Sequence, residues 1–167
     1  MAVYFGTTIN DSPTIVLPAN AAITGAQGKA AVVTSGKIKI ADTAGAAVIG
    51  VIPLSEDDDI AAGADVTVQI KDIGVWIAGE AIAIGDELTT DAYGKAVKAA
   101  AGDFVVGVAL SAAAAAGTRI SFQMTKSGYK AAGLKLSDLA DVTLTTPANT
   151  EVLKYDGTKW VNGTDAT

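Results

Sequence analysis

The segment VIGV at residues 48–51 returns almost unchanged as VVGV at residues 105–108, and this repeat is the clearest indication of the fold. The two glycines are 57 positions apart (107 − 50). After a loop, the alternating segment that begins at Val66 matches the one that begins at Ile120, 54 positions later (120 − 66). Matches in the same order predict an internal duplication.

Upstream of these segments, Gly36-Lys37 matches Gly94-Lys95. Each copy is therefore expected to contain a strand after Gly-Lys, an apolar-Gly-Val strand, a loop and an alternating strand. Chance similarity between β-rich segments is the alternative, since spaced glycines are common turn residues. The pattern predicts a mainly all-β fold, a small barrel or sandwich built from two similar β units.

The chain shows four compositional zones, each with its own expected role. Residues 1–21 contain Pro13 and Pro18 around a short apolar segment, and we expect an N-terminal arm. The other zones are a β-barrel-like domain with the duplication at 22–125, a linker at 126–133 and a C-terminal hairpin module at 134–167. Proline lacks a donor for a β-ladder and belongs at sheet edges. The arm is thus suited to adding a strand to a partner, through Thr14, Ile15, Val16 and Leu17.

Composition excludes several function classes. The chain has no Cys and no His, so it lacks the residues of disulfides, typical zinc sites, thiol nucleophiles and Ser-His-Asp triads. The net charge is −6 and Arg119 is the one arginine, which argues against a nucleic acid partner. No apolar run is long enough for a membrane span, and no secretory signal is evident. We expect synthesis in the host cytoplasm and no cofactor.

The acidic cluster Glu56–Asp59 is a candidate cation site, because adjacent carboxylates suit a hard cation such as calcium. Its spacing does not match an EF-hand loop, and the equivalent loop of the second copy is alanine-rich. A solvated loop is the alternative. No nucleotide-binding glycine motif is present, and no carboxylate pair has neighbours that would separate the two pKa values for catalysis.

The apolar content is mostly small side chains, which make a thin core and favour association with other copies. Trp76 lies in the segment IGVWI at residues 73–77 and is expected either in the core or at a subunit interface. We take Val75, Trp76 and Ile77 as the candidate self-association residues.

Several short motifs in residues 22–125 resemble those of a family of tailed-phage head decoration, or cement, proteins. The motifs are Gly85-Asp86, Leu88–Asp91, Gly94–Val97, Val106–Leu110, an alanine-rich loop and a closing alternating strand. The resemblance implies a β-barrel-like subunit without enzymatic activity. It also implies that the subunit forms a homotrimer and binds the major capsid protein on the virion exterior, where it stabilises the capsid.

The tail resembles a short module that recurs in phage virion and tail-fibre proteins. The residues that carry this resemblance are Leu136, Asp138, Leu139, Asp141, Val142, Tyr155, Asp156, Gly157 and Trp160. Asp-Gly between two aromatic residues predicts a tight hairpin in which Tyr155 and Trp160 meet across the strands. A disordered tail is the structural alternative. A tail-associated, adhesin-like module that binds host surface glycans through these aromatics is the functional alternative.

Overall fold

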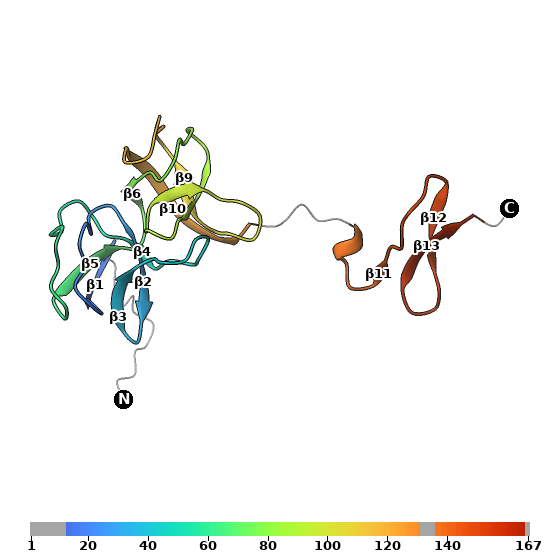
Figure 1. Ribbon diagram of the computed structural model, residues 1–167, viewed down its shortest axis with the longest axis horizontal. Coiled ribbons are helices and arrows are strands. Elements are labelled where there is room, and N and C mark those ends of the chain that lie inside the picture. Colours follow the sequence, from blue (N-terminus) through green and yellow to red (C-terminus); the bar gives the residue numbers. More distant parts are fainter. Residues whose placement is uncertain (1–12, 131–135, 166–167) are drawn as a thin grey trace, which may run out of the picture. The chain divides into compact units, whose positions relative to one another are not determined.

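The computed structural model describes residues 13–130 and 136–165, and these residues form an almost entirely β structure (Figure 1). The chain divides into an N-terminal unit, residues 1–130, and a C-terminal unit, residues 131–167. One short 3₁₀ turn is the only helical element in the described ranges, so none of their segments is a helix that could cross a membrane. The prediction of an all-β fold is confirmed.

The described part of the N-terminal unit consists of two five-stranded sheets. The first contains β1 (Thr14–Pro18), β2 (Ala30–Thr34), β3 (Lys37–Ile40), β4 (Gly50–Val51) and β5 (Asp65–Gln69). The second contains β6 (Ile73–Ile77), β7 (Glu87–Thr90), β8 (Ala96–Lys98), β9 (Phe104–Ala109) and β10 (Arg119–Tyr129).

The two sheets have the same topology. The first runs β1-β5-β4-β2-β3 and the second β6-β10-β9-β7-β8, so adding five to each label of the first order produces the second. Two bridges repeat in the same places, Ala19 to Ile38 matching Ala78 to Ala96. The prediction of two similar β units is thereby confirmed. The bridges draw the two edge strands of each sheet together at one corner, but neither sheet closes into a barrel, and the arrangement is sandwich-like.

The repeated glycines have a common physical reason. A Cβ at Gly50 would lie 1.9 Å from the carbonyl oxygen of Gln69, and one at Gly107 would lie 2.2 Å from that of Gln123. Gln69 and Gln123 are themselves 54 positions apart (123 − 69), so they are equivalent in the two copies. At both sites a neighbouring strand approaches so closely that no side chain fits.

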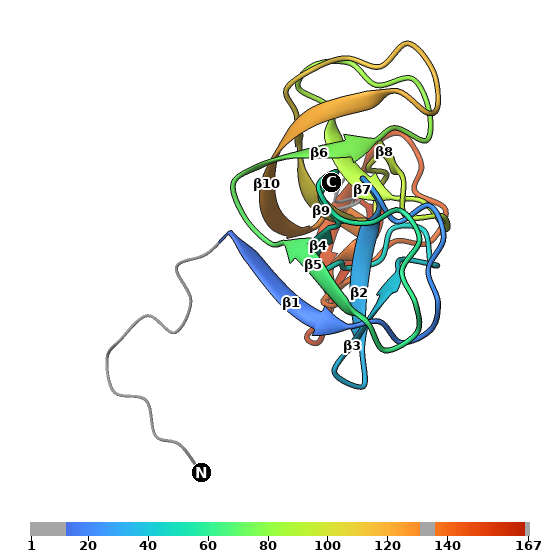
Figure 2. The ribbon, with the colours of Figure 1, turned by 90° about the vertical axis from the view of Figure 1, so that its left-hand side faces the viewer.

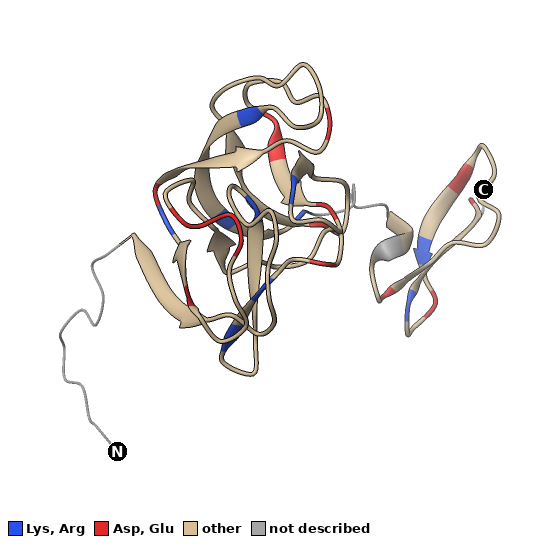
Figure 3. Cartoon of the chain, turned by 60° about the vertical axis from the view of Figure 1, so that its left-hand side comes forward, with Lys and Arg blue, Asp and Glu red and all other residues tan. Residues whose placement is uncertain are grey.

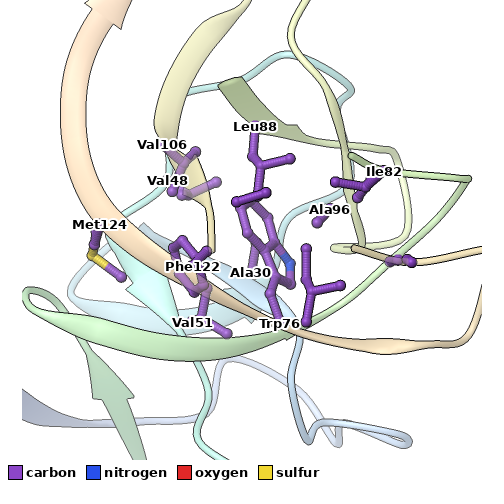
Figure 4. Packing of buried hydrophobic residues seen from close by; sticks show 14 of the residues in the cluster. Ala30, Val48, Val51, Trp76, Ile82, Leu88, Ala96, Val106, Phe122 and Met124 are labelled. Atoms are coloured by element: carbon purple, nitrogen blue, oxygen red, sulfur yellow. The ribbon is translucent and has the colours of Figure 1, made fainter. Parts of the chain in front are cut away.

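The main core lies where the two sheets meet and is centred on Trp76 and Phe122, whose ring centroids are 5.1 Å apart (Figure 4). Ala30 and Val51 of the first sheet contribute to the same cluster. A second cluster of Ile, Val and Ala side chains fills the curve of the first sheet. Burial of the large aromatic pair therefore joins the two copies into one unit.

Gly94 ties the sheets together through its backbone. Its carbonyl accepts hydrogen bonds from the N–H of Ala30 (2.7 Å) and from Nε1 of Trp76 (2.9 Å). Its φ is +72°, and a Cβ there would lie 2.7 Å from Cγ2 of Ile40. The second Gly-Lys motif noted in the sequence thus marks a close contact between the two sheets, whereas a Cβ at Gly36, in the first motif, would meet nothing within 4 Å.

Two boundaries differ from those expected. Residues 14–18, assigned above to an arm, form β1, because Ile15 and Leu17 pack against the apolar cluster of the first sheet. Residues 126–129, assigned above to a linker, continue β10 after a register shift between Met124 and Gly128. Residues 1–12 and 131–133 of the predicted arm and linker lie outside the described residues.

The C-terminal unit is a small three-stranded sheet with the order β11-β13-β12, preceded by a 3₁₀ turn. Its elements are η1 (Leu136–Asp138), β11 (Val142–Thr143), β12 (Glu151–Tyr155) and β13 (Trp160–Thr164). The hairpin of β12 and β13 pairs Tyr155 with Trp160, and their ring centroids are 5.5 Å apart. The predicted C-terminal hairpin is confirmed.

Candidate functional site

The segment predicted to contact a partner forms an edge strand. β1 pairs with β5 in antiparallel register, from Thr14 opposite Gln69 to Pro18 opposite Asp65, and no strand of the described chain pairs along its other side (Figure 2). Val16 is 55% exposed, while Thr14, Ile15 and Leu17 are half-buried.

Hydrogen bonds at the two ends of β1 show which backbone groups face outward. Ile70 donates to the carbonyl of Pro13 (2.8 Å), and Ala19 donates to that of Ala64 (2.7 Å), so the odd-numbered residues face β5. The N–H and C=O of Val16 therefore point away from β5, and no described residue pairs with them. Pro18 also points outward, where its missing N–H breaks no ladder bond. We call this row of outward-facing groups the open edge of β1.

The equivalent strand of the second sheet, β6, has a partly covered edge. The N–H of Ile77 donates to the carbonyl of Gly28 (3.0 Å), and Nε2 of Gln69 donates to that of Ile73 (2.7 Å). These contacts occupy both ends of the β6 edge. Of the two equivalent edges, β1 is therefore the more accessible to a strand from another protein.

An apolar groove of about 220 Å³ adjoins the first sheet at Gln69, the cross-strand neighbour of Thr14. The groove is lined by Pro53, Leu54, Ser55, Gln69, Ile73, Gly74, Val75 and Ser121. Ile73 is 59% exposed at its rim. Val16 in β1 and Ile73 in β6 are thus both exposed apolar residues.

Charge is absent from β1 itself, which contains no Lys, Arg, Asp or Glu (Figure 3).

The acidic cluster Glu56–Asp59 lies in the loop between β4 and β5, and two of its carboxylates accept hydrogen bonds from backbone N–H groups of this chain. Glu56 Oε2 accepts the N–H of Thr67 (2.6 Å), and Asp58 Oδ1 accepts the N–H of Gln27 (3.1 Å). Among the described residues no group of three or more carboxylates is placed to hold a metal ion.

Two lysines connect the two sheets. Nζ of Lys126 donates to the carbonyl of Ile49 (2.6 Å), and Nζ of Lys29 donates to that of Tyr93 (3.0 Å). Burial lowers the pKa of Lys126, and burial together with the charge of Lys95 lowers the pKa of Lys29. These lysines have a structural role between the sheets and do not belong to the open edge.

The predicted self-association residues divide between core and surface. Trp76 has 0% exposure and is enclosed by side chains of this chain, so it cannot contact another copy. It faces inward because strand alternation places it with Gly74 and Ala78, on the side of Phe122. Val75 and Ile77 are half-buried on the opposite face, and Val75 lines the groove.

Five of the nine predicted residues of the C-terminal module line a separate pocket, together with Leu153, which was not predicted. Leu136, Leu139, Asp141, Val142, Leu153 and Trp160 line it. At the hairpin turn, the N–H groups of Lys159 and Thr158 donate to Asp156 and lower the pKa of its carboxyl. Gly157 completes the turn with a φ of +101°. The side chain of Asp138 lies outside the described residues.

The sequence reasoning missed that β1 and β6 are equivalent strands. The signal was present as ANAAI at residues 19–23 and AGEAI at residues 78–82, immediately after the two strands. Both segments make the same bridges, with Ile23 opposite Ile60 in one copy and Ile82 opposite Ala113 in the other. Pro18 and the absence of an aromatic counterpart of Trp76 in β1 obscured the match.

Comparison with known proteins agrees with this architecture. The model of the phage cement protein family matches residues 9–124, which include both sheets up to the middle of β10. The crystal structure of the N base of head fiber gp8.5 of bacteriophage phi29 is similar in fold, with a TM-score of 0.52 and 22% sequence identity. That similarity covers 70% of this chain and 97% of the other. No curated protein matches the sequence.

The N-terminal unit thus consists of two curled sheets of the same topology, and the first of them ends in an open apolar edge strand. Because the family model covers more than half of its length, the chain belongs to the phage cement protein family. It is a capsid-associated structural protein of the virion. The matched range ends before the C-terminal unit, which is therefore an addition to the family domain.

Proposed function

We propose that the chain binds the outer surface of the capsid and stabilises it, with the open edge of β1 as the contact for the major capsid protein. The observation that carries this proposal is Val16, whose backbone N–H and C=O point away from β5 and whose side chain is exposed. An extended capsid segment that pairs with Val16 would continue the sheet by one strand.

The groove beside Gln69 supplies the apolar part of the contact. A second part of the capsid protein can place apolar side chains against Ile73 and Val75, which removes their surface from water. The same contact repeated over the capsid lattice raises the apparent affinity through effective concentration. Linking neighbouring capsid subunits opposes the outward pressure of a packaged genome, so the proposed role requires no catalytic step.

Self-association is part of the proposal. The family resemblance implies a homotrimer, and a trimer would present three β1 edges to the capsid. Synthesis in the host cytoplasm is a further part of the proposal. An oligomer also compensates for a core built mostly from small side chains.

The test is co-sedimentation of the full chain with undecorated capsids. Val16→Lys places a charge on the open edge, and we expect the bound fraction to fall by about tenfold or more, because burying an unpaired ammonium is strongly unfavourable. Val33→Lys is the matched control, since Val33 is 43% exposed in β2, a strand with neighbours on both sides. Both variants should keep the wild-type melting temperature. Equal capsid binding by the two variants would remove β1 as the contact.

A further inference from the structure

The C-terminal unit has almost no core of its own. Of its residues whose burial is described, Val142 alone is buried. Leu144 and Val161 are half-buried, and the remaining large apolar side chains described in the unit are exposed: Leu136, Leu139, Val152, Leu153, Tyr155 and Trp160. A sheet normally buries one of its faces, so this distribution leaves the unit without the burial that would hold it folded.

The exposed apolar side chains collect on one face. Leu153 of β12 and Trp160 of β13 lie across from Leu139 and Val142, around a pocket of about 240 Å³. Tyr155 extends this face through its ring contact with Trp160. We call this surface the module groove. Val152, the next residue along β12, points to the opposite face and does not line it.

Other ways of stabilising so small a unit are not open to it. The unit comprises residues 131–167, and below about 40 residues a fold usually needs disulfides, a metal or oligomerisation. The chain has no Cys and no His, and its described residues hold no cluster of metal ligands. Of these three ways to stabilise a very small fold, oligomerisation is the one that remains.

We infer that copies of the chain associate through the module groove, with the grooves of the C-terminal units of the oligomer packed together. The inference rests on the proposed self-association and assigns it to Leu153 and Trp160, in place of the buried Trp76. Asp141 is the one charged residue that lines the groove, so little charge repulsion opposes the contact. Copies already gathered on a capsid would also meet at high effective concentration.

The chain provides a matched pair of substitutions on adjacent residues. Leu153 is 38% exposed inside the groove, and Val152 is 39% exposed on the opposite face. Leu153→Asp and Val152→Asp therefore introduce the same charge at the same exposure in one strand. The first readout is the mass of the free full-length chain by sedimentation velocity at micromolar concentration. The second is amide hydrogen exchange over residues 151–164, which reports the hairpin even where the N-terminal units also associate.

We expect an oligomer for the wild type and for Val152→Asp, with slow exchange in the hairpin. Leu153→Asp should raise the hairpin exchange rates at least tenfold and shift the mass toward the monomer. A monomeric wild type overturns both the proposed self-association and this inference, and it frees the groove for another ligand such as a host surface glycan. An oligomeric wild type whose mass and hairpin exchange are unchanged by Leu153→Asp overturns the inference alone.

Discussion

The two halves of the N-terminal unit share one backbone plan but fill it with different side chains. Leu17 in β1 occupies the place that Trp76 occupies in β6, two residues before the equivalent bridging alanines. The loop that carries Glu56 in the first half is alanine-rich in the second. The glycines at close strand contacts are the same in both. The shared strand topology thus requires glycine where strands approach closely, while the core accepts different residues if the space is filled.

Truncating the two equivalent side chains, Trp76 and Leu17, should reveal the largest difference between the two halves. Trp76→Ala should lower the free energy of unfolding by about 4 kcal/mol, because a fully buried ring is lost from the main core. Leu17→Ala should cost about 2 kcal/mol, since Leu17 is only half-buried. Urea unfolding followed by circular dichroism measures both. A larger loss for Leu17→Ala would show that the first sheet dominates the fold.

The repeated glycines should respond equally in the two halves. Gly50→Ala and Gly107→Ala are each expected to cost about 3 kcal/mol, because the new Cβ would overlap a backbone carbonyl oxygen. Gly63→Ala and Gly117→Ala are the controls, since both sites are open but have φ of +78° and +87°. The controls should cost about 1 kcal/mol each. The two halves are not energetically equivalent if Gly50→Ala and Gly107→Ala, or Gly63→Ala and Gly117→Ala, differ in cost by more than about 1 kcal/mol.

The acidic loop is a place where the halves should differ. Glu56→Ala leaves the N–H of Thr67 without its acceptor and should cost about 1 kcal/mol. Asp59→Ala removes an exposed carboxylate from the same loop and should change the unfolding midpoint very little. A strong loss of thermal stability on adding a chelator to the wild type would contradict this assignment and indicate a bound cation.

The sequence alone predicted the all-β class, the duplication and the hairpin, because each leaves a local pattern. Alternating residues after Val66 and Ile120, and Asp156-Gly157 between two aromatics, report on backbone geometry within a few residues. The boundary of the first sheet was not predictable in this way. β1 joins that sheet through pairing with β5, about fifty residues later, and flanking prolines made it look like an arm.

The site was less predictable than the fold, for a similar reason. Strand alternation does not say which face is inside, so Trp76 stayed ambiguous between core and interface until Phe122 was placed beside it. The open edge of β1 depends on the order of the strands in the sheet and on which residues direct their N–H and C=O toward β5. Neither can be read from the sequence of Thr14–Leu17. The acids of the loop likewise showed their partners, Thr67 and Gln27, only in the folded chain.

A cryo-EM map of decorated capsids tests the proposed capsid contact most directly. We predict that a segment of the major capsid protein runs along β1, within hydrogen-bonding distance of the N–H and C=O of Val16. The groove lined by Ile73 and Val75 should be covered in the same map. A map in which β1 faces solvent and the capsid is held by the C-terminal hairpin would contradict the proposal.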